Sequence, residues 1–518
     1  MGFVTHRIGR AAAPRDYAMC VQRTIESVDG NPLSARENRG IGMKRTLVAG
    51  AVTLIVSLLL PAAAYAAAAG GHAPHLDGSA FGLYWGIPFA GILLSIAIFP
   101  LVAPHFWEHN FGKISAFWSV GVLLPFMVFF GWQLTLFEIV HLMLLEYLPF
   151  IILLLALFTV AGGIHFAGSF RGTPLSNTAF LAGGTAIASW TGTTGASMLL
   201  IRPVMRANAE RKHKVHVIVF FIFLVSNIGG SLTPLGDPPL FLGFLKGVSF
   251  FWPTVHMFVP MLIVASALLV IFFVLDTILV RREGVKHEAP TEPTKIGING
   301  WANVGLLGCV VAAVLMSGIW NPGIRFTVYH VDVELQNLLR DVLLLLITWV
   351  SWTFTDREHR EANAFNWHPI VEVAKLFAGI FITIVPVIAI LKAGENGALS
   401  AVIGAVTSET GEPVNAMYFW LTGILSSFLD NAPTYLVFFN AAGGDAETLM
   451  GPLAGTLLAV SAGAVFMGAN SYIGNAPNFM VKAIAESSGI KMPSFFGYLG
   501  WSIVFLLPLF AVVTWIFF

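Results

Sequence analysis

The chain has 518 residues, of which 56% are hydrophobic and 11% charged, and its basic and acidic residues balance to a net charge of zero. Soluble domains carry about 25% charged residues, so this composition indicates a membrane protein, and without a basic excess nothing points to a nucleic-acid partner. The two cysteines, Cys20 and Cys309, are too few and too far apart for a disulfide framework or a resident metal site.

The first 66 residues need a separate interpretation. Residues 1–42 are polar and arginine-rich, and we expect them to be a mis-annotated extension. Residues 43–66 are typical of a signal peptide, with Lys44 and Arg45, an apolar run, and small residues that suit a cleavage site. The alternative is an uncleaved first helix behind a cytoplasmic tail. N-terminal sequencing of the mature protein decides, since a start before residue 43 contradicts the first interpretation.

Continuous apolar runs of membrane-spanning length recur along the rest of the chain, and they predict helices rather than short alternating strands. In chain order, the uninterrupted spans are expected at 84–103, 114–131, 134–162, 252–280, 302–319, 341–354, 369–391 and 496–518.

Four other apolar segments are interrupted by polar, Gly-rich or Pro-rich stretches. Segments 176–200 and 415–440 break at Thr191–Ser197 and at Asp430–Thr434, which predicts two re-entrant hairpins with polar tips. Segments 216–246 and 451–484 contain SNIGGSLTPLGDPP and GANSYIGNAPN, which predict two discontinuous helices. Unwound backbone is tolerated in a membrane where protein or a water-filled cavity satisfies its polar groups. The interruptions therefore mark a candidate binding site.

The distribution of Lys and Arg supports the two hairpins. With both hairpins in place, only Lys246, Arg325, Arg340 and Lys392 fall outside the cell, whereas basic residues concentrate in the inside segments. This path predicts that 201–214 and 356–360 are cytoplasmic and that 395–412 and 441–449 are external.

The same order of features occurs twice. Residues 80–286 form a first transmembrane repeat and 302–518 a second, joined by a cytoplasmic linker at 287–301. The first hairpin opens from the cytoplasm and the second from outside, so the repeats are inverted. The predicted fold is an all-α polytopic membrane protein with the architecture of a secondary transporter, whose binding site forms near the midplane where discontinuous helices meet. We expect it in a bacterial-type inner membrane, embedded in the lipid bilayer.

The paired stretches SNIGGSLTPLGDPP and GANSYIGNAPN resemble the ion transporter superfamily, which includes NhaD-type sodium/proton antiporters, citrate and dicarboxylate carriers, and arsenite-efflux proteins. The resemblance covers most of residues 80–518. The dicarboxylate branch carries Ser-Asn-Thr triplets at its hairpin tips, where this chain has Thr-Gly-Thr-Thr at 191–194 and Asp-Asn-Ala-Pro-Thr at 430–434. The resemblance implies a homodimer, each protomer having a scaffold and a mobile transport domain.

Two aspartates within apolar segments are the leading candidates for an ion site. Asp430 lies at the tip of the second hairpin, and Asp237 precedes Pro-Pro in the first break. Both residues have an alternative interpretation as helix N-caps. The full set of candidate ion- or substrate-binding residues is Thr193, Thr194, Ser226, Asn227, Asp237, Asp430, Asn431, Thr434, Asn470, Ser471 and Asn475.

The polar candidates also have structural interpretations. The asparagines offer uncharged oxygens to a hard cation, or they bind loose backbone at the breaks. The hydroxyls ligate an ion, or they pack between helices. His141 and Glu146 form a secondary protonatable pair, because residues five apart do not share an α-helical face well.

The preferred function is exchange of a sodium ion for protons at the membrane aspartates, with no cofactor and no enzymatic activity. The alternatives are cation-coupled uptake of citrate or another carboxylate, arsenite efflux, and a channel. An intramembrane aspartyl protease is a remote alternative, because Pro234 replaces the first Gly of that enzyme class's Gly-x-Gly-Asp motif.

Overall fold

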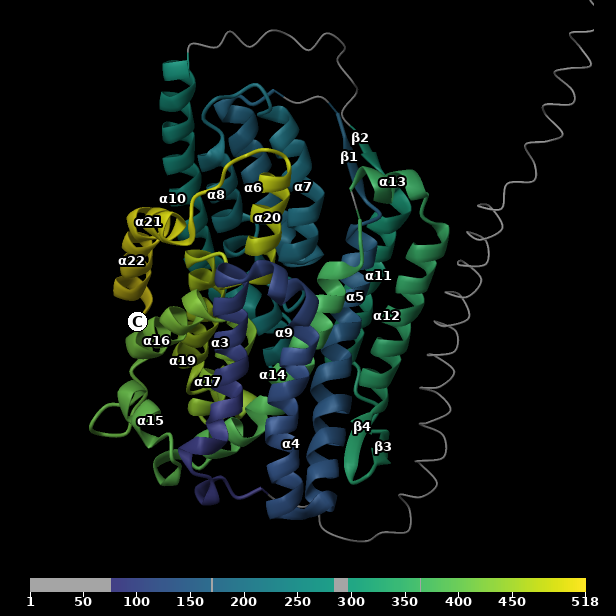
Figure 1. The fold of residues 1–518 in the computed structure, drawn as a ribbon, viewed down its shortest axis with the longest axis vertical. Helices are drawn as coiled ribbons and strands as arrows, with labels where there is room; N and C mark the ends of the chain where they lie inside the picture. Colours follow the sequence, from purple (N-terminus) through teal and green to yellow (C-terminus); the bar gives the residue numbers. More distant parts are fainter. Residues whose placement is uncertain (1–75, 169–170, 284–296, 364) are drawn as a thin grey trace, which may run out of the picture. The chain divides into compact units, whose positions relative to one another are not determined.

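The computed structural model describes residues 76–168, 171–283, 297–363 and 365–518 (Figure 1). The predictions for 1–42 and 43–66, and most of the predicted linker at 287–301, lie outside these residues. Six helical segments of the described chain are long and apolar enough to cross a membrane, or seven if the bent pair at the C-terminus counts as one span.

The first half begins with long helices. They are α3 (Ile87–Val102), α4 (Pro104–Leu142), the π-helix η3 (Met143–Tyr147) and α5 (Leu148–Ala161). The run from Pro104 to Ala161 has 58 residues, far more than the roughly 20 that one span needs. Gly131 divides it, because its backbone (φ 82°, ψ 164°) is not helical. Two spans were predicted here, and a glycine supplies the positive φ at their junction.

The predicted interruptions of the first half appear as breaks between helices. The first hairpin consists of α6 (Pro174–Thr191) and α7 (Thr193–Ala207), which pack against each other and meet at Gly192. The discontinuous helix consists of α8 (Val215–Leu224), a short turn η4 (Ile228–Gly230) and α9 (Pro238–Leu245). The half closes with α10 (Trp252–Glu283).

The second half repeats this order. Helices α11 (Trp301–Ile319), α12 (Leu335–Phe354) and α14 (His368–Lys392) come first. The second hairpin is α16 (Asn415–Phe428) with α17 (Asn431–Ala441). The second discontinuous helix is α19 (Ala454–Met467), η6 (Gly468–Asn470) and α20 (Ala476–Ser487). Helices α21 (Phe495–Phe505) and α22 (Leu507–Phe517) end the chain.

Short elements connect the long helices. Strands β1 (His165–Ala167) and β2 (Gly297–Asn299) pair antiparallel, so the end of the predicted linker is a strand that joins the two halves. Strands β3 (Arg325–Val328) and β4 (Val331–Glu334) form a hairpin. The remaining helices and turns are η1 (Gly78–Ala80), η2 (Leu83–Gly86), α13 (Arg357–Ala362), η5 (Gly394–Asn396), α15 (Ser400–Val406) and α18 (Ala446–Met450).

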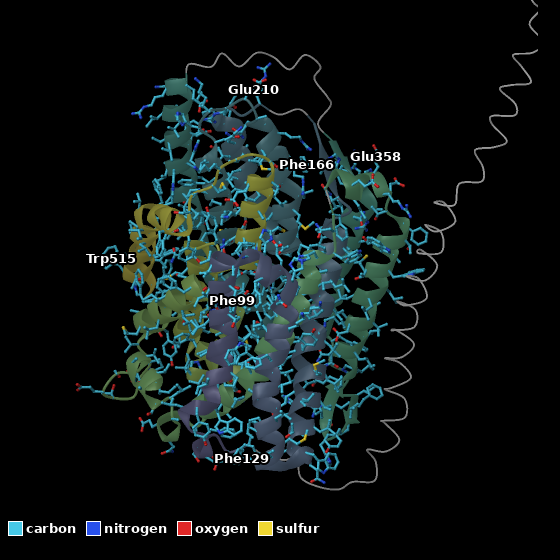
Figure 2. The ribbon with its side chains drawn as sticks, viewed as in Figure 1. Phe99, Phe129, Phe166, Glu210, Glu358 and Trp515 are labelled. Carbon is cyan, nitrogen blue, oxygen red and sulfur yellow. The ribbon has the colours of Figure 1, made fainter. Side chains whose placement is uncertain are left out.

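The two halves approach the centre from opposite directions. In Figure 1, α6 and α7 come from the top of the view, whereas α16 and α17 lie in its lower half. Glu210 and Glu358, from the two segments predicted to be cytoplasmic, lie at the same end of the molecule in Figure 2, and Phe129 lies at the other end. This arrangement agrees with the predicted inverted repeat. The fold is an all-α polytopic membrane protein.

The last predicted span differs from a straight helix. Residues 496–518 were expected to form one span, but α21 and α22 are bent by 42°. Pro508 lies at the start of α22 and has no N–H to donate to the preceding turn, which explains the break.

Candidate ion-binding site

The tip of each hairpin contacts the break of the discontinuous helix in its own half. The backbone N–H of Thr193, at the first tip, donates to the carbonyl of Gly236 at 2.8 Å. In the second half, the N–H of Asn431 donates to the carbonyl of Gly474 at 3.2 Å. Unwound backbone at the breaks is thus partly satisfied by the hairpin tips, as a membrane interior requires.

Asp237 is the point where all four interruptions meet. Its side chain is buried, with 1% exposed. Its Oδ1 accepts hydrogen bonds from the Thr193 hydroxyl at 2.9 Å and from Asn475 Nδ2 at 2.8 Å. Its Oδ2 accepts one from Asn431 Nδ2 at 2.5 Å. The three donors come from the first hairpin tip, the second break and the second hairpin tip, so one carboxylate links both halves of the chain.

The sequence explains why this carboxylate is available. An N-cap side chain normally accepts from the backbone N–H of the second or third helical residue. Asp237 is followed by Pro238 and Pro239, which have no N–H, and the N–H of Leu240 bonds to the Asp237 backbone carbonyl. Accordingly, the Asp237 side chain makes no cap bond to α9. The structure therefore contradicts the interpretation of Asp237 as an ordinary side-chain N-cap.

Asp430 has the opposite role. It is only half-buried, and its Oδ1 accepts from the N–H of Ala432 at 3.0 Å, which caps α17. Ala432 is the second residue of that helix and keeps its N–H. Both aspartates were predicted as candidates for the ion site, and in the structure it is Asp237 that lies at the centre of the polar network.

A cluster of amides surrounds Asp237. Asn475 Nδ2 also lies 3.2 Å from the Ser226 carbonyl and 3.2 Å from Asn227 Oδ1. Asn227 Nδ2 donates to Asn478 Oδ1 at 2.7 Å. The hydroxyls of Ser226 and Ser197 share a hydrogen bond of 2.8 Å between the first break and the first hairpin. Both breaks are therefore joined to each other directly, across about half of the sequence.

Two amide oxygens in this region have no hydrogen-bond partner among the described residues. Asn431 Oδ1 and Asn470 Oδ1 are buried and unpaired. The nitrogens of the same amides are bonded, Asn431 Nδ2 to Asp237 and Asn470 Nδ2 to the hydroxyl of Ser427 at 2.9 Å. An unpaired buried acceptor is unfavourable unless a donor or a cation approaches it.

The remaining predicted residues make local contacts. The Thr434 hydroxyl donates to the Asp430 carbonyl within its own helix at 3.0 Å. Ser471 Oγ accepts from the backbone of Ile473 and Gly474, which closes a turn in the second break. Thr194 is half-buried beside the first tip.

Sequence reasoning did not identify the serines that fasten the hairpins to the breaks. The Ser189 hydroxyl donates to the carbonyl of Gly229 at 2.6 Å in the first half. In the second half, Ser426 donates to Ala464 at 2.7 Å, and Ser427 donates to Met467 at 3.2 Å. One sequence signal could have identified these residues: serines precede both hairpin tips by less than two helical turns.

Helix N-termini converge on the site. Thr193 and Asn431 are the first residues of α7 and α17, and Asn475 and Asp237 are the N-caps of α20 and α9. Each helix N-terminus carries about half a positive elementary charge, which stabilises an anion. The carboxylate of Asp237 occupies the place at which these termini meet. Asp430 directly precedes Asn431, which donates to Asp237, so a second carboxylate lies beside the site.

Glycines allow the breaks to approach this closely. A Cβ added to Gly468 would lie 3.3 Å from both Asn227 Oδ1 and Asn431 Nδ2. A Cβ on Gly230 would collide with the methyl group of Thr193, and one on Gly236 with the backbone of Gly230. Side chains at these positions would push the tips away from the breaks.

Paired discontinuous helices, whose ends gather around a buried carboxylate, define a secondary transporter rather than an enzyme. The chain belongs to the family described as "Putative citrate transport", whose model matches residues 78–518. Similar proteins named uncharacterized transporters occur in Mycobacterium bovis and Mycobacterium tuberculosis. Each is 24% identical over 329 residues, which cover 62% of this chain and 71% of the relative.

Proposed function

We propose that this transporter exchanges a sodium ion for protons across a bacterial inner membrane, with Asp237 as the group that binds the two in turn. The observation that carries the proposal is the chemistry of the unpaired atoms. Beside the buried carboxylate, the fully buried polar side-chain atoms of the described breaks and tips that lack partners are the oxygens of Asn431 and Asn470. Carboxylate and amide oxygens are ligands for hard cations.

The electrostatics of the site support a cation rather than an anion as cargo. In the described chain, the side-chain donors to Asp237 are two amides and one hydroxyl, with no Lys or Arg among them. The convergent helix N-termini already face the chain's own carboxylate, so an incoming carboxylate substrate would meet the charges of Asp237 and Asp430.

Coupling follows from competition at one carboxylate. An ionised Asp237 attracts a cation, whereas a protonated Asp237 has no charge to offer it. Proton binding and cation binding therefore exclude each other, and a proton gradient can drive the cation in the opposite direction. Apparent sodium affinity should fall as the pH is lowered.

A second candidate is cation-coupled transport of citrate or a related carboxylate. The description of the family favours it, and helix N-termini can hold a carboxylate substrate. In that case, sodium would lie at the oxygens of Asn431 and Asn470, and the substrate would lie near the N-termini of α7 and α17.

Reconstitution into liposomes with an internal pH dye separates the candidates. Sodium, lithium, potassium, citrate and arsenite are added in turn under an imposed proton gradient. Cation-for-proton exchange predicts a pH change on adding sodium or lithium without citrate. A current driven by citrate, with no response to sodium alone, would replace the first proposal by the second.

A further inference from the structure

Side-chain hydrogen bonds and ion pairs divide the described helices, apart from the short α15, into two sets. The site set comprises α6 to α10 and α16 to α22, and the flanking set comprises α3 to α5 and α11 to α14. Each set is bonded internally. In the flanking set, for example, Arg360 Nη1 donates to Thr159 at 2.9 Å and Ser351 donates to Asn303 at 2.7 Å.

Contacts between the two sets are mostly apolar. Helix α5 packs on α7, and α14 packs on α17. The ring of Phe150, in α5 of the flanking set, has its centroid 6.4 Å from that of Phe241 in the site set. It also lies 4.7 Å from the ring of Phe377 in its own set. Apolar contact has no directional requirement, so such an interface permits the two sets to shift.

One ion pair among the described residues joins the two sets. Lys246 Nζ lies 2.5 Å from Glu146 Oε1, and the two side chains are 23% and 8% exposed. Further polar contact is slight, as in the hydrogen bond of 3.4 Å from Arg206 to the carbonyl of Phe166. Among the described residues, the Glu146–Lys246 pair is thus the one ion pair across a mostly apolar interface.

The pair lies at the far end of the half-helix that begins at the site. Helix α9 has eight residues, with Asp237 as its N-cap and Lys246 as its C-cap. A helix of that length is a rigid rod of about 12 Å. Any constraint on Lys246 therefore also constrains the position of Asp237.

Glu146 sits in a local irregularity of its own helix. Residues Met143–Tyr147 form a π-helix, a feature that is frequent at functional sites. The second carboxylate oxygen of Glu146 is buried and has no partner in the described chain.

We propose that the Glu146–Lys246 ion pair is a latch, which fixes α9 against the flanking set in this conformation and opens in every transport cycle. Asp237 is buried here, and a transporter must expose its site to each side in turn. The partial desolvation of the pair, with one oxygen unpaired, limits its net stability, so it can open. The inference depends on the chain being a secondary transporter and not on which substrate it carries.

A cross-link tests the latch directly. In a background with Cys20→Ser and Cys309→Ser, the pair Glu146→Cys and Lys246→Cys is joined by Hg²⁺ after reconstitution. Transport should fall by at least about fivefold and return when a thiol removes the metal. The matched control is Asn415→Cys with Thr456→Cys, which replaces a hydrogen bond of 2.8 Å inside the site set. Its cross-link should leave transport unchanged.

The readout is the sodium-driven pH change, or uptake of labelled citrate if the wild type does not respond to sodium. A failure of cation exchange is therefore visible in the wild type before any cross-link is made. Complete cross-linking of 146 to 246 with unchanged transport would overturn the latch.

A second measurement covers the case in which the cysteine pair does not fold. Glu146→Gln leaves the half-buried Lys246 without its ion-pair partner, and Lys246→Gln leaves the buried Glu146 without it. The double variant leaves neither charge. Each single variant should slow transport by at least about fivefold, and the double variant should recover much of that loss. A double variant that shows no recovery, with the losses of the two single variants simply combined, would also overturn the proposal.

Discussion

Asn431 Nδ2 lies 2.5 Å from Asp237 Oδ2, although the two residues are 194 positions apart in the chain. This bond connects the tip of the second hairpin to the break of the first discontinuous helix. Because Asn431 is also bonded through its backbone to Gly474 in the second break, it joins three of the four interruptions. The carboxylate at the centre is thus held by both halves of the repeat.

The first prediction compares the two aspartates. Asp237→Asn should abolish proton-coupled flux, because it removes the titrating group at the centre of the network. The fold should survive, since the neutral amide is easier to bury and Asn431 can rotate to present its unpaired oxygen. Asp430→Asn should retain most activity, because asparagine caps a helix about as well as aspartate. Flux is measured in liposomes at matched protein content.

Full activity in Asp237→Asn would remove this residue from the mechanism. Loss of flux in Asp430→Asn alone would assign the role to Asp430 at the tip of the second hairpin, the other aspartate that the sequence predicts as a candidate.

The interruptions were predictable from composition, and the role of each aspartate was not predicted. Gly, Pro and Asn in apolar segments indicated the two hairpins and the two breaks, and the helices now begin and end at those residues. Asp237 and Asp430 look alike in sequence, since each precedes a helix that contains proline. The difference is whether the second helical residue has an N–H: Ala432 has one and Pro239 does not. That rule also fits Asn475, which is followed by Ala476 and Pro477 and makes no cap bond.

Other features could not be read from periodicity. The π-helix at Met143–Tyr147 has no distinct sequence pattern, so it was not predicted. The ion pair between Glu146 and Lys246 joins residues 100 positions apart, and no local rule predicts such a contact.

The second prediction concerns Gly468. Gly468→Ala should slow transport several-fold while the protein still inserts, because the added Cβ would lie 3.2 Å from the Gly474 carbonyl and 3.3 Å from Asn227 Oδ1. Gly183→Ala is the matched control, since a Cβ at this helical position meets nothing within 4 Å. Equal activity of the two variants would show that the break accommodates an added methyl group at position 468, which would contradict this prediction.

The third prediction concerns a buried network that fastens the first hairpin to α8 and α10. Asp276 accepts from Arg211 at 2.6 Å and from Asn177 at 2.9 Å, and lies 2.8 Å from His216 Nε2. Asp276→Ala removes the shorter of the two ion pairs of the buried Arg211, which keeps Glu283 at 3.4 Å, and it leaves Asn177 and His216 without this acceptor. The loss should be about 3 kcal/mol, at the lower end of the range for a broken buried pair. Thermal unfolding in detergent measures the change.

The pair Lys482–Glu486 is the control for that experiment, because the side chain of Glu486 is 42% exposed. Glu486→Ala should change stability by no more than about 1 kcal/mol. A loss of stability of similar size in both variants would mean that burial of the Asp276 network adds nothing to the stability of the protein.

The fourth prediction concerns topology. Single cysteines introduced at Glu210 and Glu358 should react with an impermeant thiol reagent only from the cytoplasm, and one at Asp445 only from outside. Both glutamates lie at the same end of the molecule (Figure 2). Labelling at 445 only from the cytoplasm would contradict the second hairpin.

Binding of radioactive sodium to the purified protein, measured as the pH is changed, tests directly whether Asp237 binds sodium and protons in turn. The wild type should bind sodium saturably at high pH, with an apparent affinity that falls as protons compete at Asp237. Asp237→Asn should bind sodium weakly at every pH, with no such dependence. Sodium binding that is equally strong and equally dependent on pH in both proteins would contradict this role of Asp237.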